Sequence, residues 1–176
     1  MVKLSKLLAY VMFFILALIY FMPKESVYYY LEKELQKQKI ILSDEEIIDN
    51  GFSLQLNNTK LSYDSIESAN VENINIKIFL VYNSLSVSNV RLLDVASSFV
   101  PLHVDTINIK YTIFNPLNIV AESNGEFGQA SAEVNILDRN ISMVLKPSPL
   151  MLKKYRATLR NLKKNKAGEY KYEKTF

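Results

Sequence analysis

The sequence predicts a mainly β protein with flanking helices: an N-terminal transmembrane helix, a curved antiparallel β-sheet or partial barrel, and a C-terminal amphipathic helix. Three observations lead to this fold class: an uncharged apolar stretch near the N-terminus, a long region of two-residue hydrophobic alternation, and a return to helical spacing near the C-terminus. They divide the chain into a membrane anchor over 1–24, a helical stalk over 25–39, an antiparallel β domain over 40–147, and a basic amphipathic helix with a tail over 148–176.

The anchor is the apolar run over 7–22, which contains no charged residue. At about 1.5 Å per residue it covers about 24 Å, and with Lys6 and Lys24 snorkelling at its ends it spans a hydrocarbon core of about 30 Å. A cleaved signal peptide is the alternative, but its cleavage site requires small residues, and this run ends in Tyr20-Phe21-Met22-Pro23. We therefore expect an uncleaved single-pass anchor, with Lys3 and Lys6 holding the N-terminus in the cytoplasm and the rest of the chain translocated.

The stalk over 25–39 follows a break at Pro23 and reads as a second helix. Ser26 suits its N-cap, and Val27, Leu31 and Leu35 fall on one apolar stripe, whereas the opposite face is charged. This pattern predicts an amphipathic helix that continues from the membrane span.

The β domain over 40–147 is predicted from side chains that alternate between apolar and polar. Ile74, Ile76 and Ile78 face one way, whereas Asn73 and Asn75 face the other, and this pattern recurs along the region. Turn signals are Asn57-Asn58, Asn83-Ser84, Asn115-Pro116 and the segment Leu137-Asp138-Arg139-Asn140. Because no helical crossover separates the strands, we expect an antiparallel meander with one aliphatic face.

The C-terminal part returns to helical spacing over 150–166, with Ser148 as its N-cap and Pro149 at its first position. Gly168 ends the helix, and 169–173 forms a terminal strand or tail. Residues 150–176 contain nine Lys or Arg against Glu169 and Glu173, so they carry +7 and residues 1–149 carry −4. Two interpretations stay open: a helix packed on the sheet with a solvated basic face, or contact with an anionic lipid surface or a partner. The residues of that contact would be Lys153, Lys154, Arg156, Arg160, Lys163 and Lys164.

Residues that carry catalytic or metal-binding chemistry are sparse. The chain has no Cys, its single histidine is His103, and its four glycines are too scattered for a phosphate-binding loop. The acidic segment Asp44-Glu45-Glu46 with Asp49 fits no EF-hand spacing and is typical of a turn. We expect no enzymatic activity, no cofactor, no metal site and no nucleic-acid partner.

The aliphatic face of the sheet is the remaining candidate site. It is either an ordinary core covered by the two helices or the lining of an open groove that holds acyl chains. The residues concerned are Ile74, Ile76, Ile78, Ile107, Ile109, Ile113, Val134 and Ile136.

This organisation resembles a known family. The short anchor is followed by an amphipathic strand at Phe52-Ser-Leu-Gln-Leu, the segment Ile113-Phe-Asn-Pro-Leu, the element Gly125-Glu-Phe-Gly128 and a closing Gly168-Glu-Tyr-Lys-Tyr-Glu173. The chain is similar to the type II secretion system protein N family, in the small form expected of epsilonproteobacteria, and more distantly to AsmA-like β-rich proteins.

The resemblance implies a bacterial inner-membrane protein whose C-terminal domain lies in the periplasm. Its leading function is then that of an accessory or structural subunit of a type II secretion-like apparatus, with inner-membrane lipid and other secretion-system membrane proteins as partners. The AsmA side of the resemblance implies the alternative, a lipid-binding or lipid-transfer module with an apolar β groove.

Overall fold

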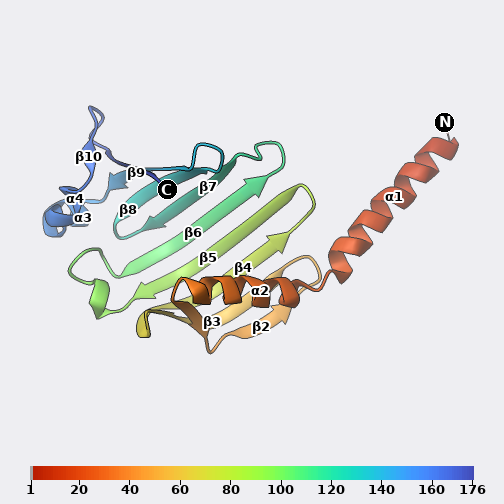
Figure 1. Cartoon of the computed structure of the whole chain (residues 1–176), viewed down its shortest axis with the longest axis horizontal. Helices are drawn as coiled ribbons and strands as arrows, with labels where there is room; N and C mark the ends of the chain where they lie inside the picture. Colours follow the sequence, from red (N-terminus) through yellow and green to blue (C-terminus); the bar gives the residue numbers. More distant parts are fainter. Residues whose placement is uncertain (1) are drawn as a thin grey trace.

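The N-terminal part consists of two helices. The computed structural model describes residues 2–176, so Met1 of the predicted anchor lies outside the described residues. Helix α1 (Val2–Phe21) and helix α2 (Lys24–Lys37) are separated at Pro23, because proline lacks the N–H that would continue the hydrogen bonds of α1. Helix α1 extends away from the rest of the molecule (Figure 1) and is long and apolar enough to cross a membrane.

The β domain is one antiparallel sheet of eleven strands that does not close into a barrel. The strands are β1 (Ile40–Ser43), β2 (Glu46–Asp49), β3 (Leu54–Tyr63), β4 (Ile66–Ile78), β5 (Tyr82–Leu92), β6 (His103–Thr112), β7 (Asn118–Gly125), β8 (Gly128–Asn135), β9 (Asn140–Pro147), β10 (Lys163–Lys164) and β11 (Tyr170–Thr175). From β3 to β9 each strand pairs with the one before it, β1 and β2 both pair with β3, and β11 joins β9 to β10. The prediction of a mainly antiparallel fold is therefore confirmed.

Two helical segments cover parts of one face of this sheet. Helix α2 lies over the strands at the N-terminal end, where Tyr28 is buried with Leu56 and Val71. The segment therefore packs on the sheet and is not a free stalk. At the other end of the sheet, α3 (Pro149–Lys154) and α4 (Arg156–Leu159) place Met151 and Leu159 against Leu145.

The predicted continuous helix over 150–166 is wrong in its extent. The chain leaves helical geometry at Tyr155 (φ −116°, ψ 37°) and forms two short helices, followed by β10. With this bend, Leu159 and Met151 pack in one buried cluster with Leu145. Ser148 caps α3 as expected, with its Oγ accepting a hydrogen bond from Met151 N at 3.1 Å.

Two predicted turns also fall elsewhere. Strand β3 runs through Asn57-Asn58 without a turn. Asn58 has a positive φ of 55° within the strand, and asparagine tolerates that conformation. The turn expected at Asn83-Ser84 lies earlier, over 79–81. The 169–173 segment is a true strand, β11, paired with β9.

Candidate functional site

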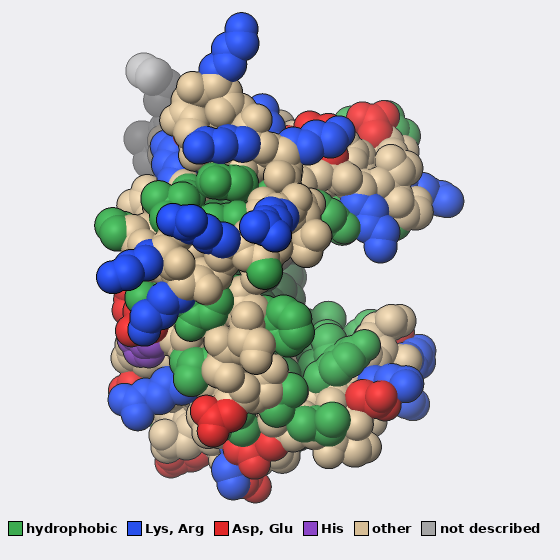
Figure 2. Space-filling view, turned by 90° about the vertical axis from the view of Figure 1, so that its left-hand side faces the viewer, with side chains coloured by type: hydrophobic (Ala, Val, Ile, Leu, Met, Phe, Trp, Pro, Cys, Tyr) green, Lys and Arg blue, Asp and Glu red, His purple; other side chains and the backbone are tan. Residues whose placement is uncertain are grey.

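The concave face of the sheet is apolar because the strand register lines up aliphatic side chains from strand to strand. Opposite residues in an antiparallel pair lie within contact distance on the same face. One row crosses the sheet through Leu54, Ile76, Leu85, Ile109, Ala121, Ala132 and Met143, and the next through Leu56, Ile74, Val87, Ile107, Ser123, Ala130 and Leu145. Figure 2 shows the result, a molecule with a C-shaped outline and hydrophobic side chains inside the hollow.

Two connected hollows lie between α2 and this face. The first, of about 360 Å³, is enclosed by Tyr28 and Leu35 of α2 and by side chains of both rows, with Glu32 at its border. The second, of about 340 Å³, continues past Val27 toward Ile109 and Ile119. Leu31, Ile76 and Leu85 line both, so the two form one groove that runs along α2. We call this continuous space the apolar groove.

Helix α2 does not seal the apolar groove. Leu31 lines it and is still 44% exposed, which is unusual for a leucine on the inner face of a covering helix. Beyond β6 the first row continues through Ala121, Ala132 and Met143, which are only half-buried and do not line the hollows beneath α2.

The position of α2 is set by one polar contact within its apolar face. Tyr28 Oη donates a hydrogen bond of 2.8 Å to Glu45 Oε1 in the turn between β1 and β2. Burial of the phenol, and next its hydrogen bond to Glu45, raise the pKa of Tyr28 well above its ordinary value. Tyr28 therefore remains a donor at any physiological pH and ties the helix to the edge of the sheet.

The structure brings most of the predicted face residues together. Ile74, Ile76, Ile78, Ile107 and Ile109 line the apolar groove. Val134 extends the same face, opposite Ile119 and Ile141. Ile113 and Ile136 do not belong to the groove: they lie just past the ends of β6 and β8, in turns, and each is 49% exposed.

The six basic residues proposed for an anionic surface are all at the end of the sheet opposite α1. Lys153 and Lys154 end α3, Arg156 begins α4 and Arg160 follows it, and Lys163 and Lys164 form β10. Strand β9, whose end leads into α3, spans roughly 26 Å at about 3.3 Å per residue. The cluster is thus separated from the base of α1 by the length of a strand, and its contact with an anionic surface stays a prediction.

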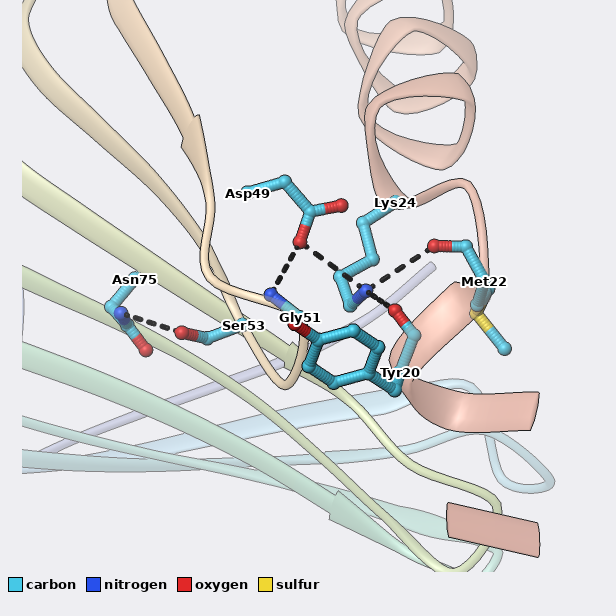
Figure 3. Close-up of polar contacts among 7 residues, drawn as sticks. All are labelled: Tyr20, Met22, Lys24, Asp49, Gly51, Ser53 and Asn75. Carbon is cyan, nitrogen blue, oxygen red and sulfur yellow. Dashed lines mark hydrogen bonds and ion pairs between the residues drawn. The ribbon is translucent and has the colours of Figure 1, made fainter. Parts of the chain in front are cut away.

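The junction between α1 and the sheet is the feature that sequence reasoning missed. Lys24 was expected to snorkel, but its side chain is 0% exposed. Its Nζ donates to the carbonyl oxygens of Tyr20 at 3.1 Å and Met22 at 3.2 Å and lies 3.3 Å from Asp49 Oδ1 (Figure 3). The cation thereby meets the carbonyl of Tyr20 in the last turn of α1, where the helix dipole is negative. No sequence pattern distinguishes this lysine from a snorkelling one.

The loop after β2 completes this junction. Asp49 Oδ1 also accepts a hydrogen bond of 2.7 Å from Gly51 N, and Gly51 has a φ of +77°. A Cβ at this glycine would lie 2.2 Å from the Tyr20 ring, so the ring packs directly on the backbone. Tyr20 also meets Phe52 edge-to-face, with ring centroids 5.4 Å apart.

Three of the four acidic residues in the segment Asp44-Glu45-Glu46 with Asp49 have structural partners. Asp44 pairs with Lys60 at 2.7 Å, Glu45 accepts from Tyr28, and Asp49 pairs with Lys24. His103 Nε2 lies 3.0 Å from Asp105 Oδ1 at the surface of the sheet. Among residues 2–176, no three His, Asp or Glu side chains are placed to hold a metal ion together.

The fold and groove define a class: an open antiparallel sheet with a partly covered apolar face and a helix that could span a membrane. Comparison with protein-family models, with curated proteins and with solved structures gave no match. Membership of the secretion protein N family stays a prediction.

Proposed function

We propose that the protein is a membrane-anchored lipid-binding module whose apolar groove accommodates acyl chains. The observation that carries this proposal is the pair of adjoining hollows, of about 360 and 340 Å³. The first is lined by aliphatic side chains except for Tyr28 and Glu32, and the second is mainly aliphatic but also includes Lys77, Asn83, Ser84 and Tyr111. Sites for small ligands are typically about 300–1,000 Å³ and mostly apolar. A groove with a mainly aliphatic lining favours a chain of methylene groups over a ligand that needs orienting hydrogen bonds.

The competing interpretation is an ordinary core. A closed core buries its aliphatic residues, yet Leu31 is nearly half exposed and Ile119 and Met143 are only half-buried. An aliphatic strip left uncovered in water carries a free-energy cost of about 25 cal/mol per Å² relative to a buried one. An acyl chain would remove that cost.

Neighbouring residues on β7 provide a matched test in the full-length protein. Ile119 lines the apolar groove, whereas the side chain of Val120 points to the opposite face, since successive strand residues alternate. A photo-crosslinking amino acid is placed at each position in turn, cells are irradiated, and lipid adducts are identified by mass spectrometry. We expect adducts at 119 and not at 120. Equal yields, or none at 119, would overturn the lipid-binding proposal.

A second variant fills the groove without adding charge. Ile76 lines both hollows of the apolar groove, so Ile76→Phe places a larger side chain where the acyl chain would lie. We expect it to abolish the adduct at 119 while the protein remains folded by circular dichroism. An unchanged adduct would place the lipid outside the apolar groove.

The proposed location is the bacterial inner membrane, with α1 as a single span and the β domain in the periplasm. Support comes from the apolar helix and from Lys3 and Lys6 before it. Because the chain contains no cysteine, the variant Ser97→Cys carries a single thiol, at an exposed position, that a maleimide can label. Labelling by a membrane-impermeant maleimide in spheroplasts is expected; labelling only after lysis would place the domain in the cytoplasm.

A second candidate function is an accessory subunit of a type II secretion-like apparatus. The observation that favours it is the open sheet: within residues 2–176 the outer edges of β1 and β10 pair with no further strand, and such edges accept strands of other chains. A photo-crosslinking amino acid is placed at Ile41 of β1. We expect it to form adducts with secretion-system membrane proteins whose strands pair with this edge. Absence of any protein adduct from both edges would count against this role.

A further inference from the structure

Several turns of the sheet lie at the same end as the base of α1. The contact of Lys24 with Asp49 fixes the base of α1 beside the loop between β2 and β3. The antiparallel register then brings three turns to that end, those joining β4 to β5, β6 to β7, and β8 to β9. In Figure 1 the first two of these turns project to the side from which α1 leaves.

These turns carry large apolar side chains that the fold leaves in the open. The β4–β5 turn presents Leu80 at 59% exposure, the β6–β7 turn Phe114 at 84%, and the β8–β9 turn Leu137 at 70%. Tight turns are ordinarily rich in Gly, Asn, Asp and Ser, and large hydrophobic residues at three turns of the same end are a departure from that rule. The turns over 79–81 and 113–117 contain no charged residue.

The turns at the other end of the sheet have a different composition. Lys39 and Asp64 form an ion pair of 2.9 Å there, Asp94 and Glu126 lie in the next two connections, and the basic α3 and α4 follow β9. Val95 and Phe99 are exposed at this end, in a connection that also holds Asp94. Each connection at the far end therefore holds a charged residue, whereas the turns over 79–81 and 113–117 near α1 hold none.

We propose that the apolar turns at the α1 end insert into the surface of the bilayer that α1 spans, with Leu80, Phe114 and Leu137 as the inserting side chains. Exposed apolar residues beside a membrane span lower their free energy by entering the boundary between headgroups and acyl chains, as interfacial helices do. Asp138 and Arg139, next to Leu137, remain at headgroup level.

This insertion gives the apolar groove a route to lipid. Ile78, Tyr111 and Ile119 line the second hollow and lie at the ends of strands that lead into the inserted turns. A mainly apolar surface then continues from the bilayer into the concave face, through turns over 79–81 and 113–117 that hold no charged residue, although Lys77, Asn83 and Ser84 also line the second hollow. The insertion rests on the anchoring part of the proposed function and not on the groove holding a lipid.

Single tryptophans test the insertion, because the chain contains no native Trp. Full-length variants Leu80→Trp, Phe114→Trp and the far-end control Phe99→Trp are reconstituted into vesicles of phosphatidylethanolamine and phosphatidylglycerol, with and without brominated acyl chains. A fourth variant, Phe13→Trp, reports on α1 itself. Bromine quenches only a tryptophan that reaches the acyl region.

We expect strong quenching and a blue-shifted emission at positions 80 and 114, and at most slight quenching at 99. Quenching at 13 without quenching at both 80 and 114 would overturn the insertion while leaving the anchor intact. Equal quenching at 99 and 114 would also overturn it, because the domain would then lie flat on the bilayer. No quenching at 13 would overturn the anchor, and with it the insertion.

Discussion

The Nζ of Lys24 lies 3.3 Å from Oδ1 of Asp49, and this ion pair joins the first residue of α2 to the last residue of β2. The two partners are not equivalent, because the lysine is fully buried whereas a third of the aspartate side chain is exposed. Removing the aspartate side chain and removing the lysine ammonium group are therefore expected to lower the free energy of unfolding by different amounts.

Asp49→Ala is expected to be the more damaging change, since it leaves a buried ammonium group without its counter-ion, a loss of about 3–5 kcal/mol for a fully buried pair. Lys24→Met leaves Asp49 partly solvated and still bonded to Gly51 N, and we expect about 1–3 kcal/mol. Urea unfolding of the full chain in detergent micelles measures both. The double variant should cost less than the sum of the two, and strict additivity would show that the pair does not act as a unit.

Gly51→Ala is expected to be destabilising for two separate reasons, its positive φ and the 2.2 Å approach of the new Cβ to the Tyr20 ring. Gly168 offers a matched control, with φ +84° and no atom within 4 Å of an added Cβ. Gly168→Ala should cost about 1–2 kcal/mol, the backbone contribution alone, and Gly51→Ala clearly more. Equal losses in thermal unfolding would mean that the Tyr20 ring moves aside freely.

Tyr28→Phe is expected to change the response of stability to alkaline pH. The unfolded chain ionises this phenol near pH 10, whereas burial and Glu45 keep it protonated in the folded protein. Stability from this group is therefore complete below about pH 10 and falls by up to about 1.4 kcal/mol per pH unit above it. Urea midpoints from pH 8 to 11 should fall less steeply in Tyr28→Phe than in the wild type or in the exposed control Tyr63→Phe. Parallel curves would contradict the assignment.

Ser148→Ala is expected to loosen the cover at the C-terminal end of the sheet. Its Oγ caps α3 through Met151 N and also donates to Glu126 O at 2.5 Å, and loss of such a cap costs about 0.5–2 kcal/mol. Because Met151 packs on Leu145, hydrogen exchange should speed up at α3 and in nearby β9. Ser97→Ala, which removes only an exposed bond to Asp94 O, is the control. Unchanged exchange in Ser148→Ala would argue against a capping role.

The strands could be predicted from the sequence because the two-residue alternation of apolar and polar side chains depends only on neighbours in the chain. Ile74, Ile76 and Ile78 alternate with polar residues, and such alternation is recorded in the chain itself. The β4–β5 turn was missed because it is made of Phe79, Leu80 and Val81, residues that normally favour strands. The proposed insertion of this turn into a lipid surface would account for that unusual choice.

The site was only partly predictable, since it depends on tertiary contacts. The aliphatic face was recognised from Ile76 and Ile109, but whether a helix covers it depends on how α2 folds back at Pro23. The break at Tyr155 and the burial of Lys24 depend in the same way on what lies opposite, Leu145 in one case and Asp49 in the other.

The order of the strands has a consequence for how the chain is assembled. Because each strand from β3 to β9 pairs with its predecessor, a chain that emerges N-terminus first offers every new strand a finished edge to join. Contacts close in sequence form fastest, so the sheet can grow vectorially, one hairpin at a time, with a single advancing edge. Strand β11 departs from this order, because it pairs with β9 across the intervening α3, α4 and β10. Its docking would be the last step of folding, and until then β9 is the advancing edge left open to neighbours.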